Sequence, residues 1–176
     1  MGKTDSGTTW FSKIQVRPLV HEDLPALEWN GEFTHFRRLY MEIYQSTYHG
    51  KALMWVAELS GLEMVGQIFV QLDSSRSELA DGKTRAYIYG FRVKSHFQGV
   101  GVGTRLLKTV EGDLLQRHYK WVTLNVGRHN LEARRFYDRL GYRVVAAEPG
   151  KWMYFDDQGR KRQVNEPAWR MLKRLG

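Results

Sequence analysis

Three glycines at alternating positions near the middle of the chain are the residues best placed to bind a charged ligand. Gly99, Gly101 and Gly103 follow a run of strand-forming residues and precede leucines and valines spaced three and four apart. This spacing predicts an amphipathic helix directly after the glycines. Backbone N–H groups at the start of a helix lack partners and the helix dipole is positive there, which predicts a phosphate or pyrophosphate site. The alternative is a tight strand-to-helix turn without a ligand.

The spacing excludes the two commonest nucleotide loops. Thr104 and Arg105 follow the last glycine, where a P-loop requires Lys and then Ser or Thr. A dinucleotide fingerprint would need its third glycine at residue 104 or 106, and neither position is glycine. The pattern that is present begins with Gln98 and continues with glycines three and five positions later.

A second motif follows a short β-rich run at residues 121–126. Asn130 is typical of a helix N-cap, and Gly141 is typical of a helix C-terminal stop. Between them, one helical face carries apolar and aromatic side chains, namely Ala133, Phe136, Tyr137 and Leu140. The segment therefore predicts a helix that lies between two strands, the second of them at residues 143–147.

The two motifs, in this order and on these elements, resemble those of the GNAT family of N-acetyltransferases. The resemblance covers most of the chain and implies a GNAT-like acyl-CoA N-acyltransferase fold of the α/β class, with acetyl-CoA as the acetyl donor. It implies that coenzyme A contacts the strand end before the loop, the loop itself and the start of the second motif. The residues at those positions are Phe91, Arg92, Val93, Gln98, Gly99, Val100, Gly101, Val102, Gly103, Thr104 and Asn130.

The same resemblance implies how the reaction is assisted. In the family, the strand end before the loop offers a backbone N–H to the thioester oxygen, and a tyrosine at the position of Tyr137 protonates or hydrogen-bonds the departing thiolate. A thiol has a pKa near 8.5 and a tyrosine near 10, so such a proton donor is chemically reasonable. The alternative interpretation of Tyr137 is an ordinary core aromatic beside Phe136.

The group that removes the proton from the amine is not identified by the sequence. Several relatives carry a glutamate on the strand before the loop, but residues 87–93 contain no carboxylate. Glu28, Glu32 and Tyr89 are candidates to hold a water chain, and each has an ordinary surface or packing role as the alternative. In the family, the region corresponding to residues 28–33 borders the acceptor site.

The elements expected to position these residues form one domain. Residues 1–12 are predicted to be a polar tail, and residues 13–176 a single N-acetyltransferase domain with a mixed, mostly antiparallel sheet flanked by helices. Coenzyme A is expected where strands 86–93 and 121–126 part. Further predicted strands cover residues 13–18, 52–59, 64–72 and 168–175, helices cover residues 21–27 and 33–48, and an extra hairpin covers residues 151–165.

Charge and composition narrow the possible ligands. The net charge is +8 over 176 residues, and residues 94–143 hold ten Lys and Arg against four Asp and Glu. This excess surrounds the glycine motif and suits a polyanionic cofactor. Nucleic acid is the disfavoured alternative, because no signature of a nucleic-acid-binding module is present. No cysteine occurs and the six histidines lack ligand spacing, so we expect no metal.

The function predicted from these features is acetyl-CoA-dependent N-acetylation by direct attack of a primary amine in a ternary complex. The acceptor is a small molecule, an antibiotic, a polyamine, a peptide N-terminus or a lysine. A non-catalytic acyl-CoA-binding or regulatory domain is the alternative. No run of residues is long and apolar enough to predict a membrane span, a cytoplasmic location is expected, and a homodimer is left open.

Overall fold

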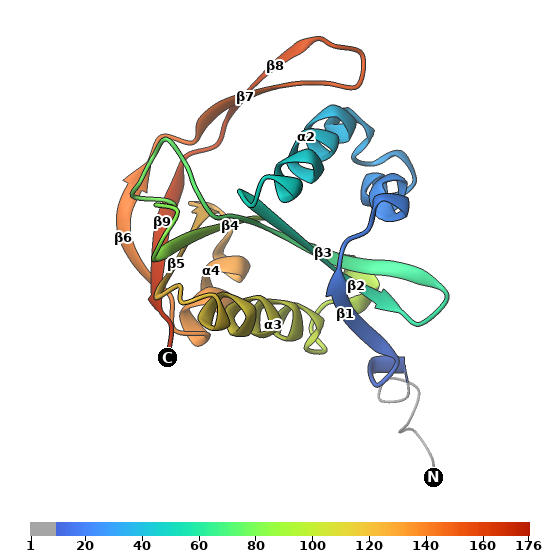
Figure 1. Ribbon diagram of the computed structural model, residues 1–176, viewed down its shortest axis with the longest axis horizontal. Helices are drawn as coiled ribbons and strands as arrows, with labels where there is room; N and C mark the ends of the chain where they lie inside the picture. The colour runs from blue at the N-terminus through green and yellow to red at the C-terminus, as the bar shows by residue number, and fades with distance from the viewer. Residues whose placement is uncertain (1–9) are drawn as a thin grey trace.

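A seven-stranded sheet forms the centre of the molecule. The computed structural model describes residues 10–176, with strand order β1-β2-β3-β4-β5-β9-β6 (Figure 1). Neighbouring strands are antiparallel except for β4 and β5, which run parallel. The expected mixed, mostly antiparallel sheet is therefore confirmed. The strands are β1 (Ile14–Pro18), β2 (Ala52–Leu59), β3 (Glu63–Gln71), β4 (Arg85–Val93), β5 (Trp121–Gly127), β6 (Arg143–Glu148) and β9 (Ala168–Arg174).

Helices cover both faces of this sheet (Figure 1). One face carries η1 (His21–Gly31), η2 (Thr34–Phe36) and α2 (Arg37–Tyr48). The opposite face carries α3 (Val102–Gln116) and α4 (Leu131–Arg139), and the short turn η3 (Ser95–Phe97) leads into the glycine loop. Among the described helices, none is long and apolar enough to cross a membrane.

Helix α3 packs through the face that its apolar spacing predicts. Leu106, Leu107, Val110 and Leu114 are fully buried, and they pack with strand side chains in one core cluster. Burial of side chains of this size contributes roughly 1.5–3 kcal/mol each. The glycine loop is thus followed by a firmly anchored helix.

The predicted helix at residues 21–27 differs in the structure. This segment forms 3-10 turns that extend to Gly31, with Pro25 inside and Trp29 and Asn30 in left-handed backbone conformations. Proline lacks the N–H that a regular helix requires, which accounts for the irregular geometry. The predicted helix at 33–48 is also divided, into η2 and α2.

The structure places residues that the sequence assigned to the polar tail. Of the predicted polar tail, residues 1–9 lie outside the described residues, but Trp10 and Phe11 are placed. The Trp10 ring contacts the Phe97 ring edge-on, with centroids 5.0 Å apart. The Phe11 ring lies beneath the guanidinium of Arg105, 5.8 Å from it, in the first turn of α3. Residues 10–12 are therefore better described as part of the packed domain than as a polar tail, because aromatic burial favours this contact.

Strands β4 and β5 separate halfway along β4. Pairing runs from Arg85–Trp121 to Ile88–Leu124 and then stops. On the other side of β4, the register with β3 shifts between Gln67 and Phe69. Gly90 lies opposite this shift with φ +59°, and a Cβ there would overlap the Phe69 ring. Glycine is required for that backbone bend, which turns the rest of β4 away from β5.

The predicted extra hairpin is present as β7 (Lys151–Phe155) and β8 (Lys161–Asn165), which extend beyond the main sheet toward α2 (Figure 1). Trp152 and Tyr154 face Phe36, with ring centroids 6.3 and 4.9 Å from it. The turn is held by Asp156, whose carboxylate accepts hydrogen bonds from the backbone N–H groups of Gln158 and Arg160. The side chain of Arg162 also donates to it, at 2.9 Å.

We expect Asp156→Asn to loosen this hairpin at neutral pH. Burial alone would raise the pKa of Asp156, but its hydrogen bonds with Arg160, Arg162 and Gln158 lower it from 3.8 to about 2. A lowered pKa stabilises the folded state above pH 4, and this stabilisation is lost as the pH falls toward 2. Amide hydrogen exchange in β7 and β8 should therefore be faster in the variant.

In thermal unfolding, the difference between Asp156→Asn and the wild type should shrink as the pH falls from 4 toward 2. Asp157→Asn is the matched control, because no hydrogen bond to its side chain is present among the described residues. Equal hairpin exchange in the wild type and in Asp156→Asn would contradict the role of Asp156.

Candidate functional site

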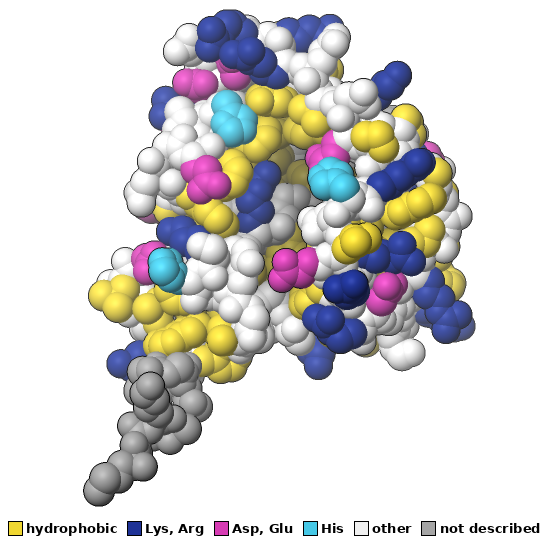
Figure 2. Space-filling model, turned by 180° about the vertical axis from the view of Figure 1, so that it is seen from behind, with side chains coloured by type: hydrophobic (Ala, Val, Ile, Leu, Met, Phe, Trp, Pro, Cys, Tyr) yellow, Lys and Arg dark blue, Asp and Glu magenta, His cyan; other side chains and the backbone are white. Residues whose placement is uncertain are grey.

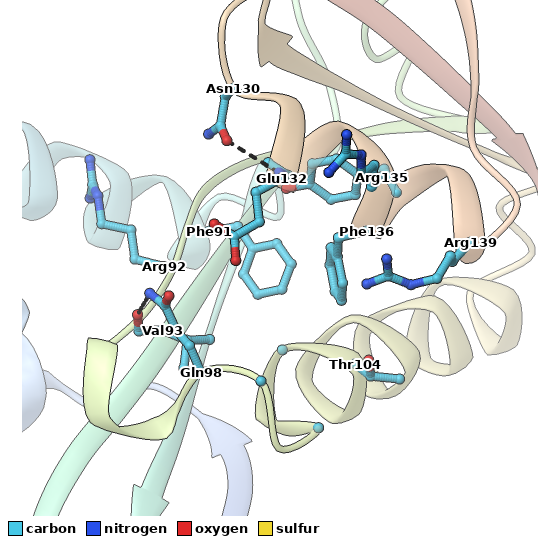
Figure 3. Close-up of a pocket in the computed structure, with 15 residues that line it drawn as sticks. Phe91, Arg92, Val93, Gln98, Thr104, Asn130, Glu132, Arg135, Phe136 and Arg139 are labelled. Carbon is cyan, nitrogen blue, oxygen red and sulfur yellow. Dashed lines mark hydrogen bonds between the residues drawn. The ribbon is translucent and has the colours of Figure 1, made fainter.

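A groove of about 690 Å³ lies between the end of β4, the glycine loop and α4 (Figure 3). It brings together residues that are far apart in the sequence, as the two motifs predict. The predicted cofactor-contact and catalytic residues that line it are Phe91, Arg92, Val93, Gln98, Gly99, Gly101, Gly103, Thr104, Asn130 and Tyr137. Val100 and Val102, predicted with them, do not line the groove: the Val100 side chain is exposed and that of Val102 is buried in the core.

The glycine loop owes its path to backbone conformations that other residues rarely adopt. Gly99 has φ +75° and Gly101 has φ +101°. The side-chain Nε2 of Gln98 donates to the carbonyl oxygen of Val93 at 2.7 Å, and this hydrogen bond ties the loop to the end of β4 (Figure 3). Conformation and anchoring together fix the loop in front of α3.

The loop presents a row of free donors. No acceptor among the described residues takes the backbone N–H groups of residues 99–104, and the first bond of α3 is from Arg105 N–H to Gly101 O. Gln98, one of the predicted contact residues, is not part of this row, because its backbone N–H donates to Ser95 O at 3.3 Å. Unpaired N–H groups at the positive end of a 15-residue helix form an anion-binding site.

Two arginines on α4 add positive charge to the same groove. Arg135 and Arg139 line it, and neither forms an ion pair with a described residue. Figure 3 shows both side chains on the wall formed by α4. The sequence analysis missed them as site residues. Their spacing of four positions on a predicted helix was the available signal, because residues i and i+4 share a helix face.

Asn130 and Tyr137 occupy the two ends of α4. The Asn130 side chain accepts a hydrogen bond from the N–H of Ala133 at 3.2 Å, so its predicted N-cap position is confirmed. The Tyr137 ring packs among aromatic side chains, with centroids 5.3 Å from Phe136 and 6.4 Å from Phe91. Burial raises the pKa of Tyr137 above its ordinary value, with a smaller contribution from Tyr87. The phenol therefore stays protonated at neutral pH and can donate a hydrogen bond.

A second cavity, of about 500 Å³, lies on the α2 face of the sheet beside the point where β4 and β5 separate. Its walls come from α2, β4, β5 and the segments around the β7–β8 hairpin. The space-filling view from behind shows the molecule hollowed near its middle, with hydrophobic and basic side chains in the hollow (Figure 2). Arg92 lines both cavities, and in Figure 3 its side chain points away from the glycine loop, toward α2.

The three residues predicted as candidates to hold a water chain lie in different parts of the structure. Neither Glu28 nor Glu32 lines the groove or the second cavity, and Glu28 is ion-paired with Arg37 at 2.9 Å. Tyr89 lines the second cavity, but burial raises its pKa, so it is not a base at neutral pH.

Two carboxylates that the sequence analysis missed line the second cavity. Glu148 is nearly buried and is held by Arg76 at 2.7 Å and Arg170 at 2.9 Å. Glu166 forms no ion pair with a described residue, and its Oε1 would lie 2.8 Å from a Cβ at Gly127, the last residue of β5. No sequence motif marks them, because both reach the site only through the fold of the C-terminal segment.

Comparison with known proteins identifies relatives of this chain. A sequence model of the acetyltransferase (GNAT) family matches residues 17–142. An uncharacterized N-acetyltransferase of Methanocaldococcus jannaschii is 36% identical over 104 residues, which are 58% of this chain and 58% of that protein. The 5-NmdU N-acetyltransferase of Pseudomonas phage PaMx11 is 35% identical over 63 residues, 36% of this chain and 43% of that protein. The chain thus spans less than two thirds of the length of these curated relatives.

Solved structures share the fold at lower identity. Ard1 from Thermoplasma volcanium superposes with a TM-score of 0.70 at 21% identity, over 93% of this chain and 99% of that one. The ribosomal-protein-S18-alanine N-acetyltransferase from Escherichia coli superposes with a TM-score of 0.67 at 18% identity, over 93% of this chain and 94% of that one. A GNAT family acetyltransferase from Elizabethkingia anophelis, with acetyl-CoA bound, gives a TM-score of 0.63 at 14% identity, over 93% and 99%.

Proposed function

This chain belongs to the GNAT family of acetyltransferases, and we propose that it transfers the acetyl group of acetyl-CoA to a primary amine by direct attack in a ternary complex. The observation that carries this proposal is that two cavities lie beside the point where β4 and β5 separate. The groove with the glycine loop would hold the donor, and the cavity beneath α2 would hold the acceptor. Arg92 lines both, so the two substrates would meet at the end of β4.

The donor would be held by the glycine loop and by the free edge of β4. The N–H groups of residues 99–104 would bind the pyrophosphate, with Arg135 and Arg139 nearby to neutralise further phosphate charge. Beyond Ile88, the edge of β4 that faces β5 has no strand partner. The pantetheine arm would pair with this edge, and a backbone N–H near Phe91 would stabilise the negative charge that develops on the thioester oxygen.

Proton transfers would involve Tyr137 and Glu166. A raised pKa keeps Tyr137 protonated, so its hydroxyl would donate to the sulfur as the thiolate leaves. On the acceptor side, Glu148 is committed to two arginines. Glu166 has no such commitment among the described residues and lies at the end of β5, so it would receive the proton of the amine directly or through water.

The decisive experiment is thiol release from acetyl-CoA with a panel of amines, with products identified by mass spectrometry. Acetylated product would support the proposed enzyme, with the described chain acting as one domain. Tight acetyl-CoA binding without turnover on any amine would instead favour the non-catalytic acyl-CoA-binding domain. A cytoplasmic location and a homodimer remain predictions from the sequence.

We expect Gly103→Val to weaken acetyl-CoA binding at least tenfold, measured by calorimetry. A Cβ at residue 103 would make ordinary contacts with Phe136 and Phe91, at 3.5 and 3.6 Å, so the protein itself has room for it. The added methyl groups would occupy the space that the ligand needs. Gly112→Val, in the same helix with nothing within 4 Å of its Cβ, is the matched control and should bind normally. Unchanged affinity in Gly103→Val would show that the ligand does not enter this groove.

Replacing Tyr137 by Phe should lower kcat by about 10²-fold, in line with the loss of a general acid. The ring and its contacts with Phe91 and Phe136 are retained, so acetyl-CoA affinity should change little. An interaction made mainly in the transition state changes the rate rather than the binding of substrate. Turnover at the wild-type rate, with a saturating acceptor, would make Tyr137 a packing residue.

Glu166→Gln should lower kcat/KM for the amine at least tenfold, because the amide cannot accept the proton. The substitution preserves size, so acetyl-CoA affinity should be unchanged by calorimetry. Glu132→Gln is the matched control, since Glu132 is a second exposed glutamate that lines the donor groove and not the acceptor cavity. Equal kcat/KM in the wild type and in Glu166→Gln would remove Glu166 from the proton path.

A further inference from the structure

The guanidinium of Arg92 lines the second cavity and is held there by aromatic rings and a hydroxyl group. It lies over the ring of Phe33, 4.2 Å from the centroid, and 5.4 Å from the centroid of Phe36. Its Nη1 donates to the hydroxyl of Tyr40 at 3.2 Å. These contacts hold the side chain in place, but they use one of the five N–H donors of a guanidinium.

Within residues 10–176, no carboxylate forms an ion pair with Arg92. Glu166, which also lines the cavity, is not ion-paired with Arg92 or with any other described residue. Glu28 is paired with Arg37, and Glu63 is paired with Lys94. In the cavity itself, Glu148 is paired with Arg76 and Arg170. A fixed cation without a counterion in a cavity wall is well suited to bind an anionic group of a ligand, and a planar guanidinium suits a carboxylate best.

An acceptor atom without a partner lies on another wall of the cavity. Asn125, on β5, is the first residue after the last paired residue Leu124. Its Oδ1 atom is buried and accepts no hydrogen bond from a described residue, although the Asn125 side chain does interact with the hydroxyl of Tyr87. A buried carbonyl oxygen without a partner is costly, and an N–H of a bound ligand would satisfy it. This atom lies beside the strand separation, where the reacting amine would have to be.

We propose that the acceptor is a small amine that carries a carboxylate, of the amino acid class, with its carboxylate on Arg92 and its amine on Asn125 Oδ1. The inference rests on the proposed function, because it names the substrate of the second cavity. The rings of Phe36, Tyr87, Tyr89 and Trp152 line the remaining walls, so an amino acid with an apolar or aromatic side chain fits them best. A polyamine would place a second cation near Arg92, which opposes its binding.

The test compares free amino acids with their primary amides. Wild-type protein and Arg92→Gln are assayed for thiol release from saturating acetyl-CoA, with L-phenylalanine, L-tryptophan and L-methionine and the three matching amides. The amide removes the negative charge and imitates the first peptide bond of a protein N-terminus. We expect wild-type turnover with at least one free acid, and we expect Arg92→Gln to lower the acid-to-amide ratio of kcat/KM at least tenfold, through KM. Arg92→Lys should recover part of the ratio.

The control variant is Arg174→Gln. Arg174 also lies over an aromatic ring, 5.8 Å from the centroid of Trp121, but it lines neither cavity. Its acid-to-amide ratio should equal that of the wild type. Calorimetry should show unchanged acetyl-CoA affinity in Arg92→Gln, which separates acceptor binding from donor binding.

Three results would overturn the inference: an unchanged ratio in Arg92→Gln, turnover of amides without turnover of any free amino acid, or binding of acetyl-CoA without turnover of either. The second result would leave the acetyltransferase function standing and point to a peptide acceptor. Failure of the proposed function itself would look different, since the wild type would then acetylate no amine of the wider panel, whether or not it bound acetyl-CoA.

Discussion

The separation of β4 from β5 is the constraint on which both cavities depend. A continuous parallel pair would satisfy every backbone group along β4 and leave no edge for a ligand. Here the pairing stops at Ile88, and the bend at Gly90 is fixed because the Phe69 ring fills the space that a side chain would need. One missing Cβ therefore connects the packing of the core to the opening of the site.

The two faces of the sheet differ in the chemistry that they offer at this opening. On the α3 and α4 face, backbone N–H groups of the loop and two unpaired arginines suit phosphates. On the α2 face, aromatic rings surround the guanidinium of Arg92, which has no ion pair with a described residue, and a buried amide oxygen. The sheet keeps these two environments apart, except where its strands part, so a polyanionic ligand and a small amine would approach from opposite sides.

Sequence patterns predicted the fold and most of the residues that meet in the groove beside the glycine loop, because the signals are local. Glycine spacing, the apolar period of α3 and the N-cap at Asn130 each depend on neighbours within a few positions.

Local signals failed where geometry depends on the whole chain. The first helix was distorted by Pro25, and Val102 proved to be buried in the core rather than to line the groove. Arg92 was selected for its backbone position, and the sequence did not show that its side chain crosses to the α2 face. Glu166 lies in the short segment between β8 and β9, and no spacing rule connects that segment with β5.

The aromatic pair near the N-terminus has a consequence for how the chain is handled in the laboratory. Phe11 lies against Gly101, about where the loop turns into α3, and Trp10 packs on Phe97 just before the loop. The loop, which the Gln98 side chain ties to the end of β4, is thus also held from outside by residues that precede the first strand. An affinity tag or a truncation at this end acts on the same segment. Such a change is therefore expected to alter ligand affinity and is not a neutral choice when the protein is prepared.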